Sequence, residues 1–274
     1  MQTLTFTIHD PHRGNPVRRI EVAASPDELR RLAAEGYLTR PAMFGGEELA
    51  ALAEGVDAVE AAERAAFGGV SGGSFGGFFA RYLEEKHPVF LRHAVGPGFT
   101  GVARAMLGPA VRLTQVSLRV TYPGEPGQET AWHTHRRMIP EPTPAWFSTP
   151  HTLDVLVYLD ETSRVNGPLA VVPGSQGRHR DQPAADDTSE LAGQEVLEVP
   201  AGSAVFLHSN LWHRGMPTLP EGAKRRLLIF SYAPAWFRDS PNGSRPEDGC
   251  AQRLRRSSDT DAPTRELLGL EGMV

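Results

Sequence analysis

The sequence has one cysteine, Cys250, among 274 residues, so it cannot close an intramolecular disulfide. It has no basic N-terminal segment followed by a long apolar run, and no window long and apolar enough for a membrane-spanning helix. Its 28 Lys and Arg residues are scattered among 33 Asp and Glu residues, which gives a net charge of −5 and does not favour nucleic acid as a partner. These absences predict a cytoplasmic protein with no nucleic-acid or membrane partner.

The most glycine-dense stretch, residues 68–77, lacks the Gly-Lys-Ser/Thr ending with which a P-loop holds phosphates. We therefore interpret it as a surface loop or lid and not as a nucleotide site.

With 40% hydrophobic residues, the chain can bury a large core, and we expect a single domain over residues 1–274. Residues 1–109 are predicted to be mainly helical. The sequence Ser25-Pro26-Asp27-Glu28 has the form of a capping box with proline at the first helical position, which predicts a helix that ends near Gly36. A strand is expected at residues 37–44, and further helices are expected at residues 47–67, 78–86 and 98–107.

From residue 110 onward, short alternating segments predict strands. In residues 111–122, apolar and polar side chains alternate with the period of two that gives a strand two unlike faces. Further strands are expected at residues 153–159, 169–172, 196–199, 203–208 and 225–232. This spacing predicts a mainly β fold with a jelly-roll (double-stranded β-helix) core at residues 110–236, flanked by N-terminal α-helices. Residues 237–274 are expected to form a partly ordered tail with one short helix.

Three histidines form the strongest functional signal. His133 and His135 are two residues apart at the end of a predicted strand, so their side chains point the same way and both reach one metal ion. His213 follows a later strand. In a jelly roll, strand ends that are distant in sequence meet at one mouth, so a close pair plus a remote third residue is typical of a facial metal site.

The motifs around these histidines occur in a characteristic order. WHTH is followed by LDETSRVNGPLAVVPGS, then by GSAVFLHSNLWH, and then by RRLLIFSYAP. In order and spacing, residues 110–236 resemble the phytanoyl-CoA dioxygenase family, and residues 29–52 are similar to its N-terminal helix, strand and helix. The resemblance implies an Fe(II)- and 2-oxoglutarate-dependent oxygenase that uses O2 to oxidise a small-molecule substrate.

The resemblance also implies roles for individual residues. His133 and His213 match the two histidine ligands of the family's metal site. Arg225 matches the arginine that pairs with the distal carboxylate of 2-oxoglutarate, a role that suits a planar, two-pronged donor. Strand register decides whether Arg225 or Arg226 points inward, and the alignment favours Arg225. Gln115 is a weaker candidate for holding the co-substrate.

One position departs from the family pattern, because His135 replaces the carboxylate ligand. Three neutral imidazoles can hold Fe(II) but supply one negative charge fewer. Three alternatives stay open: a working three-histidine iron site, a site from which His135 turns away, and a centre without oxygen chemistry. A jelly-roll isomerase or lyase with zinc or nickel, and an inactive binding protein, are the other functions that fit the sequence.

Neither the substrate nor the oligomeric state, monomer or homodimer, follows from the sequence. We expect the loop at residues 68–77 and the insert at residues 136–150 to select the substrate, because function concentrates in loops on a rigid scaffold.

Overall fold

The computed structural model describes residues 1–66, 76–135, 152–178, 182–237 and 245–271. The helices in this part of the chain are α1 (Pro26–Glu35), α2 (Gly46–Ala66), α3 (Leu83–Lys86), α4 (Pro88–Ala94), α5 (Pro97–Leu107), α6 (Cys250–Arg256) and α7 (Ala262–Leu267). The strands are β1 (Gln2–Thr7), β2 (Val17–Val22), β3 (Tyr37–Arg40), β4 (Phe78–Arg81), β5 (Val111–Thr121), β6 (Leu153–Tyr158), β7 (Leu169–Val171), β8 (Glu195–Leu197), β9 (Ser203–His208), β10 (His213–Gly215) and β11 (Arg225–Pro234).

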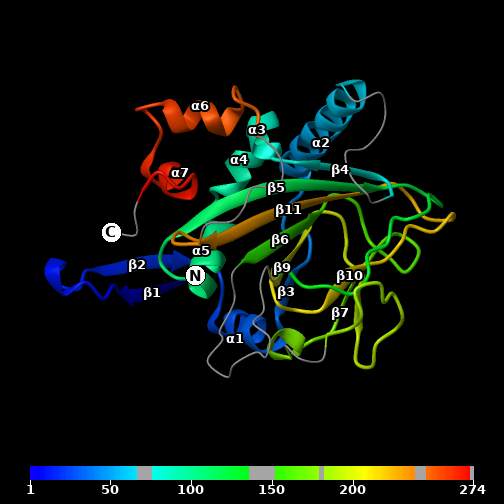
Figure 1. Ribbon diagram of the computed structural model, residues 1–274, viewed down its shortest axis with the longest axis horizontal. Helices are drawn as coiled ribbons and strands as arrows, with labels where there is room; N and C mark the ends of the chain where they lie inside the picture. Colours follow the sequence, from blue (N-terminus) through cyan, green and yellow to red (C-terminus); the bar gives the residue numbers. More distant parts are fainter. Residues whose placement is uncertain (67–75, 136–151, 179–181, 238–244, 272–274) are drawn as a thin grey trace.

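Two antiparallel sheets frame the site. The larger has six strands in the order β3-β9-β6-β11-β5-β4, and the smaller has three in the order β10-β7-β8. Figure 1 shows β7 and β10 on one side of the larger sheet and α3, α4 and α6 on the other. A separate hairpin of β1 and β2 contacts α5. The neighbouring strands of both sheets all run antiparallel, so sequence-distant strand ends are brought to common edges.

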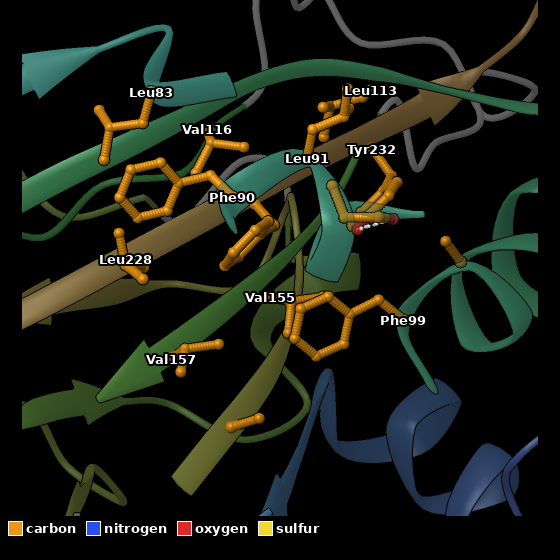
Figure 2. Packing of buried hydrophobic residues seen from close by; sticks show 14 of the residues in the cluster. Leu83, Phe90, Leu91, Phe99, Leu113, Val116, Val155, Val157, Leu228 and Tyr232 are labelled. Carbon is orange, nitrogen blue, oxygen red and sulfur yellow. Dashed lines mark hydrogen bonds between the residues drawn. The ribbon is translucent and has the colours of Figure 1, made fainter. Parts of the chain in front are cut away.

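The two faces of the larger sheet carry different side chains. Val155, Leu228 and Phe230 face the helices and pack with Phe90 and Phe99 in one hydrophobic cluster, part of which Figure 2 shows. The opposite face, which looks toward the smaller sheet, carries a second cluster that includes Leu156, Tyr158, Val205, Leu207 and Leu227. The polar residues of the site lie on this second face, between the two sheets.

The predicted start and end of the first helix are confirmed. Ser25 accepts a hydrogen bond from the backbone N–H of Glu28, and the Glu28 side chain accepts one from the backbone N–H of Ser25, which completes the capping box. Gly36 ends the helix with a positive φ of 84°, a conformation that glycine adopts without a steric penalty. The chain then enters β3, the edge strand beside β9.

The fold is mixed α/β, so the prediction of a mainly β protein needs correction. The first 109 residues carry the five helices α1 to α5, and they also contribute the strands β1, β2, β3 and β4. Residues 78–86, predicted as one helix, form β4 and the short α3. Phe78 and Ala80 alternate with more exposed neighbours and pair with β5, so burial against the sheet outweighs local helix propensity.

The C-terminal segment, for which a partly ordered tail with one short helix is expected, carries two short helices that pack against the core. Ala251 in α6 and Leu267 in α7 are fully buried. Arg255 forms an ion pair with the buried Glu85 at 2.8 Å, and Arg245 forms one with the buried Glu84 at 2.6 Å. The amphipathic pattern of this charged segment is weak, so its docking could not be predicted from periodicity. No helix in the described ranges is long and apolar enough to cross a membrane.

Candidate metal centre

Backbone pairing brings the three predicted ligands together. His133 and His213 form an isolated antiparallel bridge, in which each backbone N–H donates to the other residue's carbonyl at 3.0 and 3.1 Å. The backbone N–H of His135 donates to the carbonyl of Ser209 at 2.7 Å. The three imidazoles each offer a nitrogen, and these nitrogens lie within 4.8 Å of one another. The Nε2 atoms of His135 and His213 are 3.2 Å apart.

Hydrogen bonds at Nδ1 hold all three rings in one orientation. Nδ1 of His133 lies 2.8 Å from the carbonyl oxygen of Ala131, and Nδ1 of His213 lies 2.9 Å from that of Leu211. A carbonyl oxygen only accepts, so both Nδ1 atoms must carry the proton and both Nε2 atoms present a lone pair. Nδ1 of His135 lies 2.6 Å from Oδ2 of Asp154. The donor set therefore fits a divalent cation bound through three Nε2 atoms.

Burial keeps two of these rings neutral. It is the largest cause that lowers the pKa of His133, to about 4, and the charge of His135 lowers it further. Water reaches part of the His133 ring, but the surrounding protein still disfavours the charged form. Burial also lowers the pKa of His213 well below its ordinary value, with His133 and His135 as further causes. Metal ligation needs neutral imidazole, so both shifts favour binding near neutral pH.

Arg225 is the inward-facing member of the arginine pair at the start of β11. Its side chain is buried, and its Nε donates to Oγ1 of Thr121 at 3.2 Å. In the described part of the chain, no carboxylate lies within ion-pair distance of Arg225. Arg226 faces the other way and forms ion pairs with Asp160 at 2.8 Å and Asp57 at 3.0 Å. A buried guanidinium without a protein carboxylate suits an anionic ligand.

Gly167 makes room for Arg225. A Cβ atom on this residue would lie 2.9 Å from Nε of Arg225 and 2.9 Å from Oγ1 of Thr218, and the backbone has a φ of +58°. Both the conformation and the close approach require glycine here. The Asn-Gly turn between β6 and β7 thus leaves room for the Arg225 side chain as well as reversing the chain.

A second arginine, the half-buried Arg119, lies close enough to Arg225 for their charges to interact. Burial, and then the charge of Arg225, lower the pKa of Arg119 to about 10. Burial raises the pKa of Tyr158 to about 12, while both arginines act to lower it. Arg119 also contributes to the lowered pKa of His133, so its charge acts on both the histidines and Arg225. This positive environment fits a dianion such as 2-oxoglutarate.

Gln115 and Arg225 lie at opposite ends of the face of the larger sheet that looks toward the smaller sheet. It is paired in register with Ser231, which is also paired with Asp154, whereas Arg225 is paired with Thr121. Six residues of β5 separate Gln115 from Thr121, which is roughly 20 Å along a strand. Gln115 is therefore near the Asp154 end of the site.

Sequence reasoning misses Asp154 and Arg119. The spacing of Asp154 from Asp160 does not fit acid–base chemistry, and on that ground alone Asp154 is not a candidate. A usable signal is nevertheless present, because Asp154 interrupts the otherwise apolar run of β6, and a charged residue in a fully buried strand needs a partner. Trp132 and Trp212, which directly precede His133 and His213, are buried in a small hydrophobic cluster beside the site.

A family model for phytanoyl-CoA dioxygenase (PhyH) matches residues 32–226. The matched segment covers more than half of the chain and contains the three histidines and Arg225. The chain therefore belongs to the phytanoyl-CoA dioxygenase family.

Individual relatives are more distant. L-proline trans-4-hydroxylase from Streptomyces griseoviridis is 26% identical over 165 residues, which are 50% of this chain and 59% of that protein. The chain thus spans less than two thirds of the length of this curated relative. HygX from Streptomyces hygroscopicus, solved with nickel and 2-oxoglutarate bound, has a TM-score of 0.62 at 19% identity, with 80% of this chain and 90% of HygX covered. The carbocyclase SnoK from nogalamycin biosynthesis has a TM-score of 0.61 at 20% identity, with 78% and 85% covered. These two structures share the fold.

Proposed function

We propose that the protein is a single-domain, Fe(II)- and 2-oxoglutarate-dependent oxygenase that oxidises a small metabolite at a three-histidine centre. The observation that carries the proposal is the convergence of His133, His135 and His213 with their Nε2 atoms available, on the same face of the larger sheet as the buried Arg225. In this proposal the larger and smaller sheets form the two walls of a double-stranded β-helix, with the metal at one mouth.

The chain's own residues bind and orient the reactants. When bound, Fe(II) and 2-oxoglutarate supply the oxidising chemistry that is coupled to decarboxylation of the co-substrate. The imidazoles of His133, His135 and His213 would hold the metal ion through their Nε2 atoms. Arg225, fixed by Thr121, pairs with the distal carboxylate, and Arg119 adds a second positive charge. We propose Gln115 as a polar contact at the metal end.

The substrate class we propose is a small polar metabolite. Support comes from the named relatives, which are a hydroxylase of L-proline, a carbocyclase of nogalamycin biosynthesis and HygX, which has been solved with hygromycin B bound. The reaction class is hydroxylation or a related oxidation of a substrate carbon. The two segments that we expect to select the substrate lie almost entirely outside the described residues, at 67–75 and 136–151.

Anaerobic addition of Fe(II) and 2-oxoglutarate tests the proposal. We expect the visible charge-transfer band of a chelated 2-oxo acid in the parent protein. His213→Ala should lose the band because it removes a ligand, and Arg225→Ala should lose it at co-substrate concentrations that saturate the parent. Conversion of 2-oxoglutarate to succinate on exposure to O2 is the second readout. If the parent binds Fe(II) but forms no band with 2-oxoglutarate, the proposal is wrong.

A second candidate is a metalloenzyme of the same fold that uses zinc or nickel as an isomerase or lyase. Three neutral nitrogen donors without a carboxylate ligand suit those metals as well as Fe(II). Metal analysis after anaerobic purification separates the two candidates, because this alternative requires stoichiometric zinc or nickel and no response to 2-oxoglutarate.

A further inference from the structure

We propose that Asp154 is a positioning residue that acts on the metal through His135. Its carboxylate, hydrogen-bonded to the far side of the His135 ring, supplies the negative charge that a carboxylate ligand would supply directly. The inference rests on the proposed function only in taking the three histidines as metal ligands. It concerns a residue outside the proposed ligand set, whose side chain contacts His135 and Ser231.

The three histidines differ in what lies behind them. Nδ1 of His133 and Nδ1 of His213 each meet a neutral backbone carbonyl within their own loop. Nδ1 of His135 instead lies 2.6 Å from Oδ2 of Asp154, which belongs to the sequence-distant strand β6. The one ring with a carboxylate behind it is thus at the position where the family places its carboxylate ligand.

Asp154 is built into the sheet as a buried charge. Its side chain is 2% exposed on the central strand β6, and Ser231 on β11 donates a hydrogen bond to its other oxygen, Oδ1. Ser231 and Asp154 are direct partners in the β6–β11 register, so this contact fixes the carboxylate orientation. Within the described part of the chain, no Lys or Arg lies within ion-pair distance of Asp154.

A buried carboxylate without a cationic partner is strongly unfavourable, so the geometry points to a cation reached through His135. The Nδ1 proton of His135 lies between the carboxylate and the ring, which fixes the tautomer and makes Nε2 a stronger donor. With three neutral imidazoles, a divalent ion would keep its full charge of two in a low-dielectric site. Asp154 offsets one unit of that charge at a distance of one ring.

The test compares two carboxylate-to-amide variants in anaerobic Co(II) and Fe(II) titrations. Asp154→Asn keeps the size of the side chain and an oxygen acceptor but removes the charge. We expect it to weaken metal binding by about 10- to 100-fold, the usual effect of losing a carboxylate behind a ligating histidine. We also expect it to raise the Fe(III)/Fe(II) potential, because the ferric ion loses more stabilisation than the ferrous ion.

Asp160→Asn is the matched control. Asp160 follows the end of β6 and forms an ion pair with Arg226, which points away from the site. Asp160→Asn therefore removes the same charge as Asp154→Asn without removing a hydrogen bond to a histidine. It should bind Co(II) with the parent affinity. Equal metal affinity and equal potential in Asp154→Asn and the parent would overturn the inference.

A double-mutant cycle separates a positioning role from a general structural one. If Asp154 acts through His135, adding Asp154→Asn to His135→Ala should weaken Co(II) binding by less than about threefold, because the path is already lost. If the two losses multiply in full, Asp154 does not act through His135 and the inference is wrong.

A measurement on the parent protein covers the case in which Asp154→Asn does not fold. Imidazole nitrogen NMR with Zn(II) should show coordination of His135 through Nε2 and a strongly hydrogen-bonded proton on Nδ1. Coordination through Nδ1 would overturn the inference without a variant. If the parent binds no metal at all, both this inference and the proposed function fail. If the parent binds Co(II) and Asp154→Asn matches it in metal affinity and in Fe(III)/Fe(II) potential, this inference alone fails.

Discussion

Replacing Gly167 by alanine tests whether the turn before β7 is shaped for Arg225. The new Cβ would lie 2.9 Å from Nε of Arg225 and 3.3 Å from its Cζ, distances that force a shift. The positive φ of +58° adds a penalty of about 1–2 kcal/mol for any residue with a Cβ. Displacement of Arg225 breaks its charged hydrogen bond to Thr121, worth about 1.5–3 kcal/mol. The free energy of unfolding should therefore fall by about 2.5–5 kcal/mol.

Gly193→Ala is the matched control for this prediction. Gly193 also has a positive φ, +76°, but a Cβ atom on this residue would have nothing within 4 Å. In Gly193→Ala, the free energy of unfolding should fall only by the conformational penalty of about 1–2 kcal/mol. Its affinity for 2-oxoglutarate should equal that of the parent. Urea unfolding and anaerobic co-substrate titration measure both quantities. We expect Gly167→Ala to weaken 2-oxoglutarate binding by about 10-fold or more. If the two variants match in stability and in co-substrate affinity, the explanation for Gly167 is refuted.

Two further predictions concern the same site. Arg226→Gln should leave the affinity for 2-oxoglutarate unchanged, because Arg226 pairs with Asp160 and Asp57 outside the site, and a clear loss of affinity in a co-substrate titration would contradict the assigned strand facing. The metal-free protein should lose stability as the pH falls from about 6.5 toward about 4. In the folded state, burial holds the pKa of His133 at about 4 and that of His213 well below 6.5. The unfolded chain instead takes up protons at the ordinary histidine pKa, so lower pH favours unfolding. Urea unfolding in the presence of a chelator measures the free energy of unfolding at each pH. The slope of this free energy against pH should be smaller in His213→Gln. An unchanged slope in that variant would contradict the assignment of His213 as a buried neutral histidine.

The local sequence determined the elements whose signals are short in range. The capping box at Ser25 and the glycine at position 36 fixed the ends of α1, because both act through hydrogen bonds and backbone angles within a few residues. The alternation in residues 111–122 predicted β5, since a strand between unlike environments must alternate. The histidine motifs pointed to the three side chains that converge in the structure, because the order of these motifs along the chain is a property of the sequence.

Burial against other elements decided what local signals misjudged. Residues 78–81 have helix-compatible composition, but pairing with β5 buries Phe78 and makes them a strand. The charged C-terminal segment carries little periodicity, yet Arg245 and Arg255 dock it onto the buried Glu84 and Glu85, which are distant in sequence. Neither contact has a local signature.

The sequence by itself therefore determined the family motifs, the three histidines and the position of Arg225 at the start of a strand. Only the tertiary structure decided which arginine faces inward and that Asp154 lies behind His135. Those outcomes depend on strand register, because a shift of one residue would turn every side chain of β6 or β11 to the opposite face. Register is fixed by the summed burial of both faces of the sheet, and no single segment of the chain carries that information.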